Sequence, residues 1–293
     1  MSSIAVIHLV WAPLGIEPFR KFIQSYIRHP AGIDHDLIVL FKGFSSDEET
    51  IEYKRLLKDV EYSSLFLKNT GFDINAYRIA ANKSNHDYFC FLNSSSVILD
   101  NDWLVKLYNY ASQPTVGLVG ATGSYESTYC SPISGLKSSE DRTTYWRRFM
   151  SCDRSFYRRL IKVFNSIRFR LLYYYWYGPF PNYSIRTNAF MISKKVLNRI
   201  KWGKLVSRSD TLRFESGRRS PSKQIVKMGY ELLVVGRNGR AYKRDAFHES
   251  NTFRTCNQEN LLVADNRTDE YFKADSDRRK YLATITWGDK AML

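Results

Sequence analysis

The sequence lacks several features that would assign a class of protein directly. Its four cysteines, Cys90, Cys130, Cys152 and Cys256, include no C-x-x-C pair, so neither a zinc site nor a disulfide framework is indicated. No apolar run approaches the ~20 residues that a membrane span needs. The N-terminus has no basic stretch ahead of its apolar run, which predicts a first strand and not a signal peptide. We therefore expect a protein of the reducing cytoplasm.

A glycine-rich phosphate-binding turn is also missing. Dinucleotide-binding enzymes carry G-x-G-x-x-G directly after the first strand, whereas Trp11-Ala-Pro-Leu-Gly15 stands at that place here. This difference argues against a dehydrogenase or a methyltransferase of the Rossmann type.

The chain does have enough apolar residues for a large core and a strong excess of positive charge. Its 293 residues are 44% hydrophobic and 15% aromatic, and the formal net charge is +15. A chain of this kind is globular and fits one large domain or two small ones. The charge favours an anionic partner, which could be a nucleic acid, a membrane surface or a phosphorylated substrate.

Strand-like and helix-like patterns alternate along the chain. We predict strands over residues 4–10, 36–41, 63–67, 88–92, 115–119, 188–192 and 231–235. Helical spacing of apolar residues lies between most of them, and a further helix is expected to end at Gly229. This alternation predicts an α/β fold, Rossmann-like, with a mostly parallel central sheet flanked by helices.

The predicted domain is single, spanning residues 1–293, with a nucleotide-binding half at 1–123 and an acceptor-side half at 184–293. Between them, residues 124–183 hold a long loop and a basic, aromatic, helical insertion at 144–178. One interpretation of the insertion is a solvated helix that covers the core. The other is a contact with a membrane surface or an anionic acceptor, because basic and aromatic residues together suit the headgroup region.

The strand at 88–92 ends abruptly in small polar residues, Asn93-Ser-Ser-Ser96, at the position where open α/β sheets bind ligands. Gly71-Phe-Asp-Ile-Asn-Ala-Tyr77 and Phe91-Leu-Asn-Ser-Ser-Ser96 resemble the G-x-D-I-x-A-Y and F-L-N-S-S patterns of glycosyltransferases related to rhamnan-synthesis proteins. The resemblance extends over nearly the whole chain and implies the GT-A fold of nucleotide-sugar enzymes.

In that family an Asp-x-Asp motif ends this strand and holds a divalent metal on the donor diphosphate. Here Asn93, Ser94 and Ser95 supply only neutral oxygens, whereas Mg²⁺ and Mn²⁺ seek carboxylates. Either a metal is held elsewhere, by Asp100, Asp102 or His248, or fixed cations replace it. The cations that could do so are Arg186, Arg218, Arg219 and Lys223. Asp100 and Asp102 have an alternative role as helix caps.

Transfer of a sugar with inversion needs a general base for the acceptor hydroxyl. The segment Phe214-Glu215-Ser216-Gly217-Arg218 resembles the glutamate-containing segment that supplies this base in GT-A enzymes, so we predict Glu215 for the role, with Asp210 as second candidate. The alternative is that Glu215 is a helix-start carboxylate favoured by the helix dipole.

Further residues are predicted to bind the donor. Trp11 could stack on the nucleobase or pack the first turn, and Asp73 lies where the family contacts base or ribose, although it could also cap a helix. Arg186-Thr-Asn188 opens the strand at 188–192 and could orient hydroxyl groups. His248 resembles a late histidine that acts on the diphosphate or metal in some members. The polar-ended segment 260–266 could close over the site, with no role assigned to it.

The function predicted from these features is sugar transfer, with inversion, from a nucleotide-sugar donor to a polysaccharide or lipid-linked acceptor. We expect a role in polysaccharide biosynthesis of the cell envelope. The expected location is cytoplasmic, with a peripheral membrane contact through 144–178. The alternative is a basic protein that binds nucleic acid or another polyanion without catalysis, although no recognised nucleic-acid motif accompanies the charge.

Overall fold

The computed structural model describes residues 2–128 and 171–291, which contain one large sheet. Its strands are β1 (Ile4–Trp11), β2 (Asp36–Lys42), β3 (Ser63–Leu67), β4 (Tyr88–Leu92), β6 (Val116–Gly120), β9 (Ala189–Ser193), β10 (Glu231–Val235) and β11 (Ala241–Lys243). They stand in the order β11-β10-β6-β9-β4-β1-β2-β3. Each of the seven strands expected from the sequence lies within one residue of its predicted ends.

The sheet is mostly parallel, which confirms the expected α/β class. Strand β1 runs parallel to β2 and β4, β2 parallel to β3, and β6 parallel to β10. Strand β9 is antiparallel to both of its neighbours, β4 and β6, and β11 is an antiparallel edge. The alternation of strands and helices does not reveal this reversal, because the direction of β9 is seen only in its pairing with β4 and β6.

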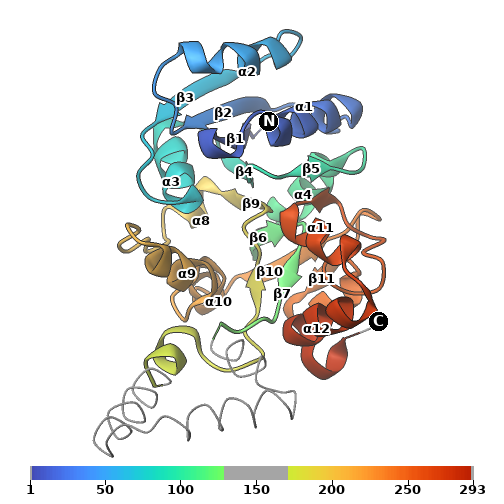
Figure 1. Ribbon diagram of the computed structural model, residues 1–293. Coiled ribbons are helices and arrows are strands. Elements are labelled where there is room, and N and C mark those ends of the chain that lie inside the picture. Colours follow the sequence, from blue (N-terminus) through green and yellow to red (C-terminus); the bar gives the residue numbers. More distant parts are fainter. Residues whose placement is uncertain (1, 129–170, 292–293) are drawn as a thin grey trace, which may run out of the picture.

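Helices cover both faces of the sheet (Figure 1). Val6 on β1 belongs to a buried cluster with side chains of α1 (Glu17–Arg28), α2 (Ile51–Leu56) and α4 (Trp103–Ala111). Ile7 belongs to a second cluster with side chains of α3 (Asp73–Lys83), α8 (Lys194–Leu197) and α10 (Pro221–Lys227). Successive side chains of a strand point to opposite faces. A strand buried on both faces must be apolar throughout, which explains the continuous hydrophobic run at the start of the sequence.

Two small two-stranded sheets join segments that lie far apart in the sequence. Strand β5 (Val97–Ile98) pairs with β12 (Val263–Ala264), and β7 (Gly123–Ser124) pairs with β8 (Ser184–Ile185). Helices α11 (Asn266–Lys273) and α12 (Ser276–Trp287) follow β12 and pack on each other. The segment after β12 is thereby placed beside the carboxyl end of β4.

The predicted insertion at 144–178 lies largely outside the described residues. Within them, residues 171–177 are helical, and the Tyr174 carbonyl accepts a hydrogen bond from Arg218 Nε at 3.2 Å. Across residues 2–128 and 171–291, no helix is both long and apolar enough to cross a membrane.

Candidate active site

The polar residues after β4 form a tight turn. The Asn93 side-chain oxygen accepts hydrogen bonds from the Ser95 backbone N–H at 3.0 Å and from the Ser96 hydroxyl at 3.1 Å. The Asn93 backbone N–H donates to the Asn188 carbonyl at 3.0 Å. An asparagine that accepts from the residues just after it is a common way to close a turn. The turn therefore ties the end of β4 to the start of β9.

A cleft of about 320 Å³ opens at this end of β4, and we call it the β4 cleft. Four residues predicted from the sequence line it together: Asn93, Arg186, Asn188 and Glu215. Ser94 and Ser95 belong to the neighbouring turn and are not among its lining residues. The structure thus brings the predicted base, one predicted arginine and the predicted strand ends into one place.

Glu215 reaches the cleft from the last turn of helix α9 (Arg208–Ser216). The helix begins with a capping box in which Ser207 and Asp210 hydrogen-bond each other's backbone N–H. The alternative interpretation of Glu215 as a helix-start carboxylate is therefore wrong, because the start lies eight residues earlier at Ser207. A carboxylate at a helix C-terminus gains nothing from the dipole, so its position there needs another reason.

The Glu215 carboxyl holds its proton unusually tightly. Burial raises its pKa from 4.5 to about 7, and the nearby Asp73 adds to the shift, while Thr187 and Arg186 oppose it. The Thr187 hydroxyl donates to Glu215 Oε1 at 2.9 Å. A carboxyl group with a pKa near neutrality can both take up and release a proton under physiological conditions. This is the property that a general base needs.

Asp73, at the first residue of α3, contributes to the same electrostatic environment. Burial raises the pKa of Asp73, and Lys42 opposes that shift. The buried Lys42 ammonium donates to the Gly71 carbonyl at 2.6 Å. The N-cap position of α3 is Phe72 and makes no side-chain capping bond, so Asp73 is not the cap that the sequence offered as an alternative.

Arg186 is held rigidly by a buried ion pair. Its Nη2 lies 2.9 Å from Asp265 Oδ2, and its guanidinium stacks 3.9 Å from the centre of the Phe253 ring. Burial alone would raise the pKa of Asp265, but Arg186 and the backbone N–H groups of Thr268 and Arg267 keep it below its usual range. The same carboxylate therefore fixes the arginine and caps helix α11.

The described residues do not fit a divalent metal. Residues 2–128 and 171–291 hold no group of three or more His, Cys, Asp or Glu side chains placed to share an ion. Of the carboxylates lining the β4 cleft, Asp265 is paired with Arg186, and Glu126 lies 3.3 Å from Arg254. Asp100, offered as an alternative ligand, pairs with Lys106 at 2.6 Å. Hard cations need several oxygens at once, so we derive no step through a metal.

Other predicted residues lie outside the β4 cleft. Asp210, Arg218 and Arg219 line a second cleft on the other side of α9. His248 packs with its ring 6.1 Å from that of Tyr125 and is not a lining residue. The role of Asp210 as second candidate base and the roles of the other three in donor binding stay predictions. The structure does not group these residues with Glu215.

Trp11, at the end of β1, and Lys223 also lie outside the β4 cleft. The Trp11 indole donates to the Asn69 side chain at 3.2 Å, and it is 36% exposed, which leaves ring surface free for stacking. The Lys223 ammonium lies 3.2 Å from the centre of the Tyr183 ring. Neither is a lining residue of the β4 cleft.

The sequence suggested that segment 260–266 could close over the site, but it assigned no role to Asp265 and missed Arg267. Asp265 and Arg267 line the cleft, and Arg267 is the more exposed of the two. The signal that could have found them is the pattern Asp265-Asn-Arg-Thr268, a helix-capping sequence directly after an apolar run. A polar helix start that follows a buried strand is a frequent place for anion-binding groups.

Comparison with known proteins gives only distant similarity. No family model and no curated protein match the chain. A solved structure described as mannosyltransferase PcManGT from Pyrobaculum calidifontis in complex with GDP-Man and Mn²⁺ is 11% identical, with a TM-score of 0.47 over 85% of this chain and 60% of that one. S. aureus TarS 1-349 in complex with UDP-GlcNAc is 14% identical, with a TM-score of 0.30 over 40% of this chain and 33% of that one. The chain spans about three fifths of the first protein and a third of the second.

Proposed function

We propose that this protein is a GT-A-like glycosyltransferase that moves a sugar from a nucleotide-sugar donor to a glycan acceptor, either a polysaccharide or a lipid-linked chain. The observation that carries the proposal is the Glu215 carboxyl, with its pKa of about 7, in a cleft at the carboxyl end of β4 beside a fixed arginine. A near-neutral base next to a cation is what displacement of a diphosphate by a hydroxyl requires.

In the proposed reaction the ionised Glu215 takes the proton of the acceptor hydroxyl as its oxygen bonds to the anomeric carbon of the donor. The bond from that carbon to the diphosphate oxygen breaks, and the electron pair leaves with the diphosphate. Direct displacement inverts the anomeric centre. Arg186 and Arg267 line the cleft and provide positive charge for the leaving group. Thr187 orients the carboxylate through its hydrogen bond.

The raised pKa of Glu215 predicts the pH dependence of the reaction. The base must be ionised, and its pKa in the free enzyme is about 7. The value of kcat/KM is therefore expected to be constant above pH 8 and to fall about tenfold for each unit below pH 6. Initial rates at low substrate concentration between pH 5 and 9 measure this profile. A flat profile through pH 7 would contradict the assignment of the base.

The donor class is tested by thermal unfolding in the presence of nucleotides. Any ligand that binds only the folded state raises the melting temperature, by the equivalent of ~2.7 kcal/mol at a hundred times its dissociation constant. We expect one nucleoside diphosphate and its sugar derivatives to stabilise the protein, and to do so when EDTA is present, since the described residues offer no carboxylate set for a metal. If no nucleotide or nucleotide sugar shifts the transition, the proposed function is wrong.

The remaining features of the proposal follow the sequence. We propose one domain over residues 1–293, because both described halves contribute strands to one sheet. We also propose that the protein acts in the cytoplasm, in the synthesis of cell-envelope polysaccharide. Residues 144–178 are proposed to contact the membrane peripherally. One observation favours the alternative of a polyanion-binding protein, namely the many basic residues that line the second cleft, beside α9.

A further inference from the structure

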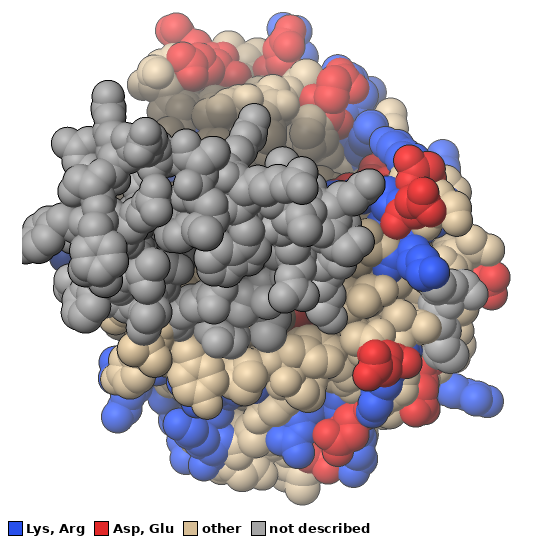
Figure 2. Space-filling model, turned by 60° about the horizontal axis from the view of Figure 1, so that its bottom comes forward, with Lys and Arg blue, Asp and Glu red and all other residues tan. Residues whose placement is uncertain are grey.

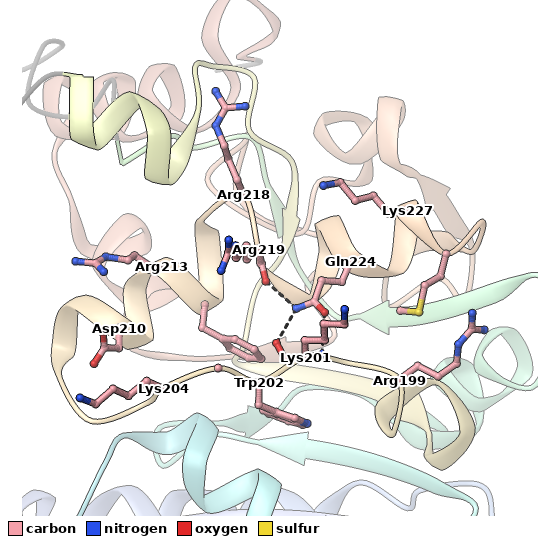
Figure 3. A pocket seen from close by; sticks show the side chains of 13 residues that line it. Arg199, Lys201, Trp202, Lys204, Asp210, Arg213, Arg218, Arg219, Gln224 and Lys227 are labelled. Carbon is pink, nitrogen blue, oxygen red and sulfur yellow. Dashed lines mark hydrogen bonds between the residues drawn. The ribbon is translucent and has the colours of Figure 1, made fainter.

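The second cleft, on the far side of α9, is lined by seven basic residues, and we call it the basic cleft. Its volume is about 1020 Å³. Asp210 is its one acidic lining residue, and the basic lining residues are Arg199, Lys201, Lys204, Arg213, Arg218, Arg219 and Lys227 (Figure 3).

The positive charge of the basic cleft is not balanced by ion pairs among the residues that the structure describes. Within the described ranges, none of its seven basic residues forms an ion pair, and Asp210 accepts a hydrogen bond from the Ser207 backbone instead. Elsewhere charges of opposite sign often stand together, as along the right edge of the face in Figure 2. Like charges gathered in a hollow repel one another and attract an anionic ligand.

The floor of the basic cleft is aromatic and firmly built. The Trp202 and Phe214 rings stack with their centres 5.2 Å apart and their planes 14° from parallel. Gln224 joins the two sides, because its amide donates to the Lys201 carbonyl at 3.0 Å and to the Arg219 carbonyl at 2.8 Å. A rigid apolar floor below a cationic rim fits sugar rings, whose C–H faces pack on aromatic groups, when those rings carry anionic substituents.

Helix α9 forms the wall between the basic cleft and the β4 cleft. Arg213 and Phe214 line the basic cleft, whereas Leu212, Glu215 and Ser216 line the β4 cleft. A helix with its side chains is about 10 Å across. A polymer of several sugar residues is long enough to lie in the basic cleft and still present its end to Glu215.

We propose that the basic cleft binds the acceptor, and that the acceptor is an anionic glycan that bears carboxylate or phosphate groups along its chain. This inference rests on the proposed function, because a bound glycan is an acceptor only if Glu215 deprotonates a hydroxyl group at its end. The same adjacency favours a glycan over a nucleic acid, which would use the charge but not the Glu215 carboxyl.

Binding of a fluorescent oligogalacturonate decamer tests the proposal, with a neutral dextran oligomer of the same length and a single-stranded oligonucleotide as comparisons. Anisotropy in 0.1 M salt is expected to show oligogalacturonate bound at least about tenfold more tightly than dextran. The triple variant K201Q/K204Q/K227Q removes three exposed lysines of the cleft and is expected to weaken binding about tenfold. The matched control K21Q/K83Q/K280Q removes three exposed lysines outside it and should weaken binding less than twofold.

Three results would overturn the inference: no preference for oligogalacturonate over dextran, equal losses in the two triple variants, or tighter binding of the oligonucleotide through the same three lysines. The last result would assign the cleft to nucleic acid. Thermal stabilisation by the nucleotide sugar, measured on the same variants, separates this question from the proposed function. A donor that stabilises all variants while oligogalacturonate fails to bind contradicts only the anionic acceptor. Oligogalacturonate bound in the cleft without any donor binding contradicts only the transfer reaction.

Discussion

Replacement of Glu215 by glutamine is expected to lower the rate of sugar transfer by at least about 10²-fold, while the fold and donor binding persist. Glutamine has the shape of glutamate and can still accept the hydrogen bond from Thr187, but it cannot take up the acceptor proton. Product formation in a single turnover with saturating donor measures the loss. Donor-induced thermal stabilisation, measured in parallel, shows whether binding is preserved.

The stability of the same variant provides an internal control. The pKa of Glu215 is raised to about 7 in the folded protein, so its contribution to stability is fully present below the unfolded value of about 4.5 and is lost as pH rises through 7. Glutamine is always neutral and escapes this loss. Glu215→Gln is therefore expected to melt no lower than the unsubstituted protein at pH 8, and a large drop there would mean that lost activity reflects unfolding.

Asp210→Asn is the matched variant for the second candidate base. Asp210 lies on the other side of the same helix, where hydrogen bonds from Ser207 hold its pKa below the usual range. The asparagine side-chain oxygen can still accept the hydrogen bond from the Ser207 backbone N–H, and Ser207 remains the cap of the helix. Near-normal turnover is expected, and a loss confined to Asp210→Asn would move the catalytic role from Glu215 to Asp210.

The order of the strands in the sequence predicted most of the sheet, because buried parallel strands leave a strong local signal. Strand β1 is apolar at nearly every position and contacts helices on both faces, so its run of Ile and Val could be read directly. The reversed direction of β9 was not predictable in this way. It is set by pairing with β4 and β6, which lie about 100 and 70 residues earlier.

The candidate site was predictable only in part, for a similar reason. Glu215 and Arg186 were found because the surrounding motifs resemble those of a known family, and the cleft does bring them together. The sequence could not show which of Arg186 and Arg218 lies in the cleft, because the orientation of an arginine side chain depends on the groups that it binds. Arg186 meets the buried Asp265, whereas Arg218 donates to the Tyr174 carbonyl on the far side of α9. Contacts between residues 44 or 79 positions apart leave no local pattern.

The pair of Asp265 and Arg186 also predicts the largest stability effect in the site. In Asp265→Ala the helix α11 loses its cap, and Arg186 keeps a nearly buried charge without its partner. Loss of a cap costs about 1 kcal/mol and loss of one member of a buried pair about 3–5 kcal/mol, although partial exposure of Arg186 reduces the second figure. We expect a destabilisation of roughly 3 kcal/mol and a melting temperature lower by about 6 °C or more.

Two variants isolate the cause of that effect. Asp265→Asn keeps an oxygen that accepts from the Arg267 and Thr268 backbone N–H groups, but it removes the charge. Its free energy of unfolding is therefore expected to lie between those of Asp265→Ala and the unsubstituted protein. Asp269→Ala, one turn later on the same helix, removes only an exposed contact 3.7 Å from Lys273 and should change the free energy of unfolding by less than ~0.5 kcal/mol. Urea unfolding at pH 7 measures all three. Equal stability of Asp265→Ala and Asp269→Ala would show that the pair with Arg186 does not hold the cleft in place.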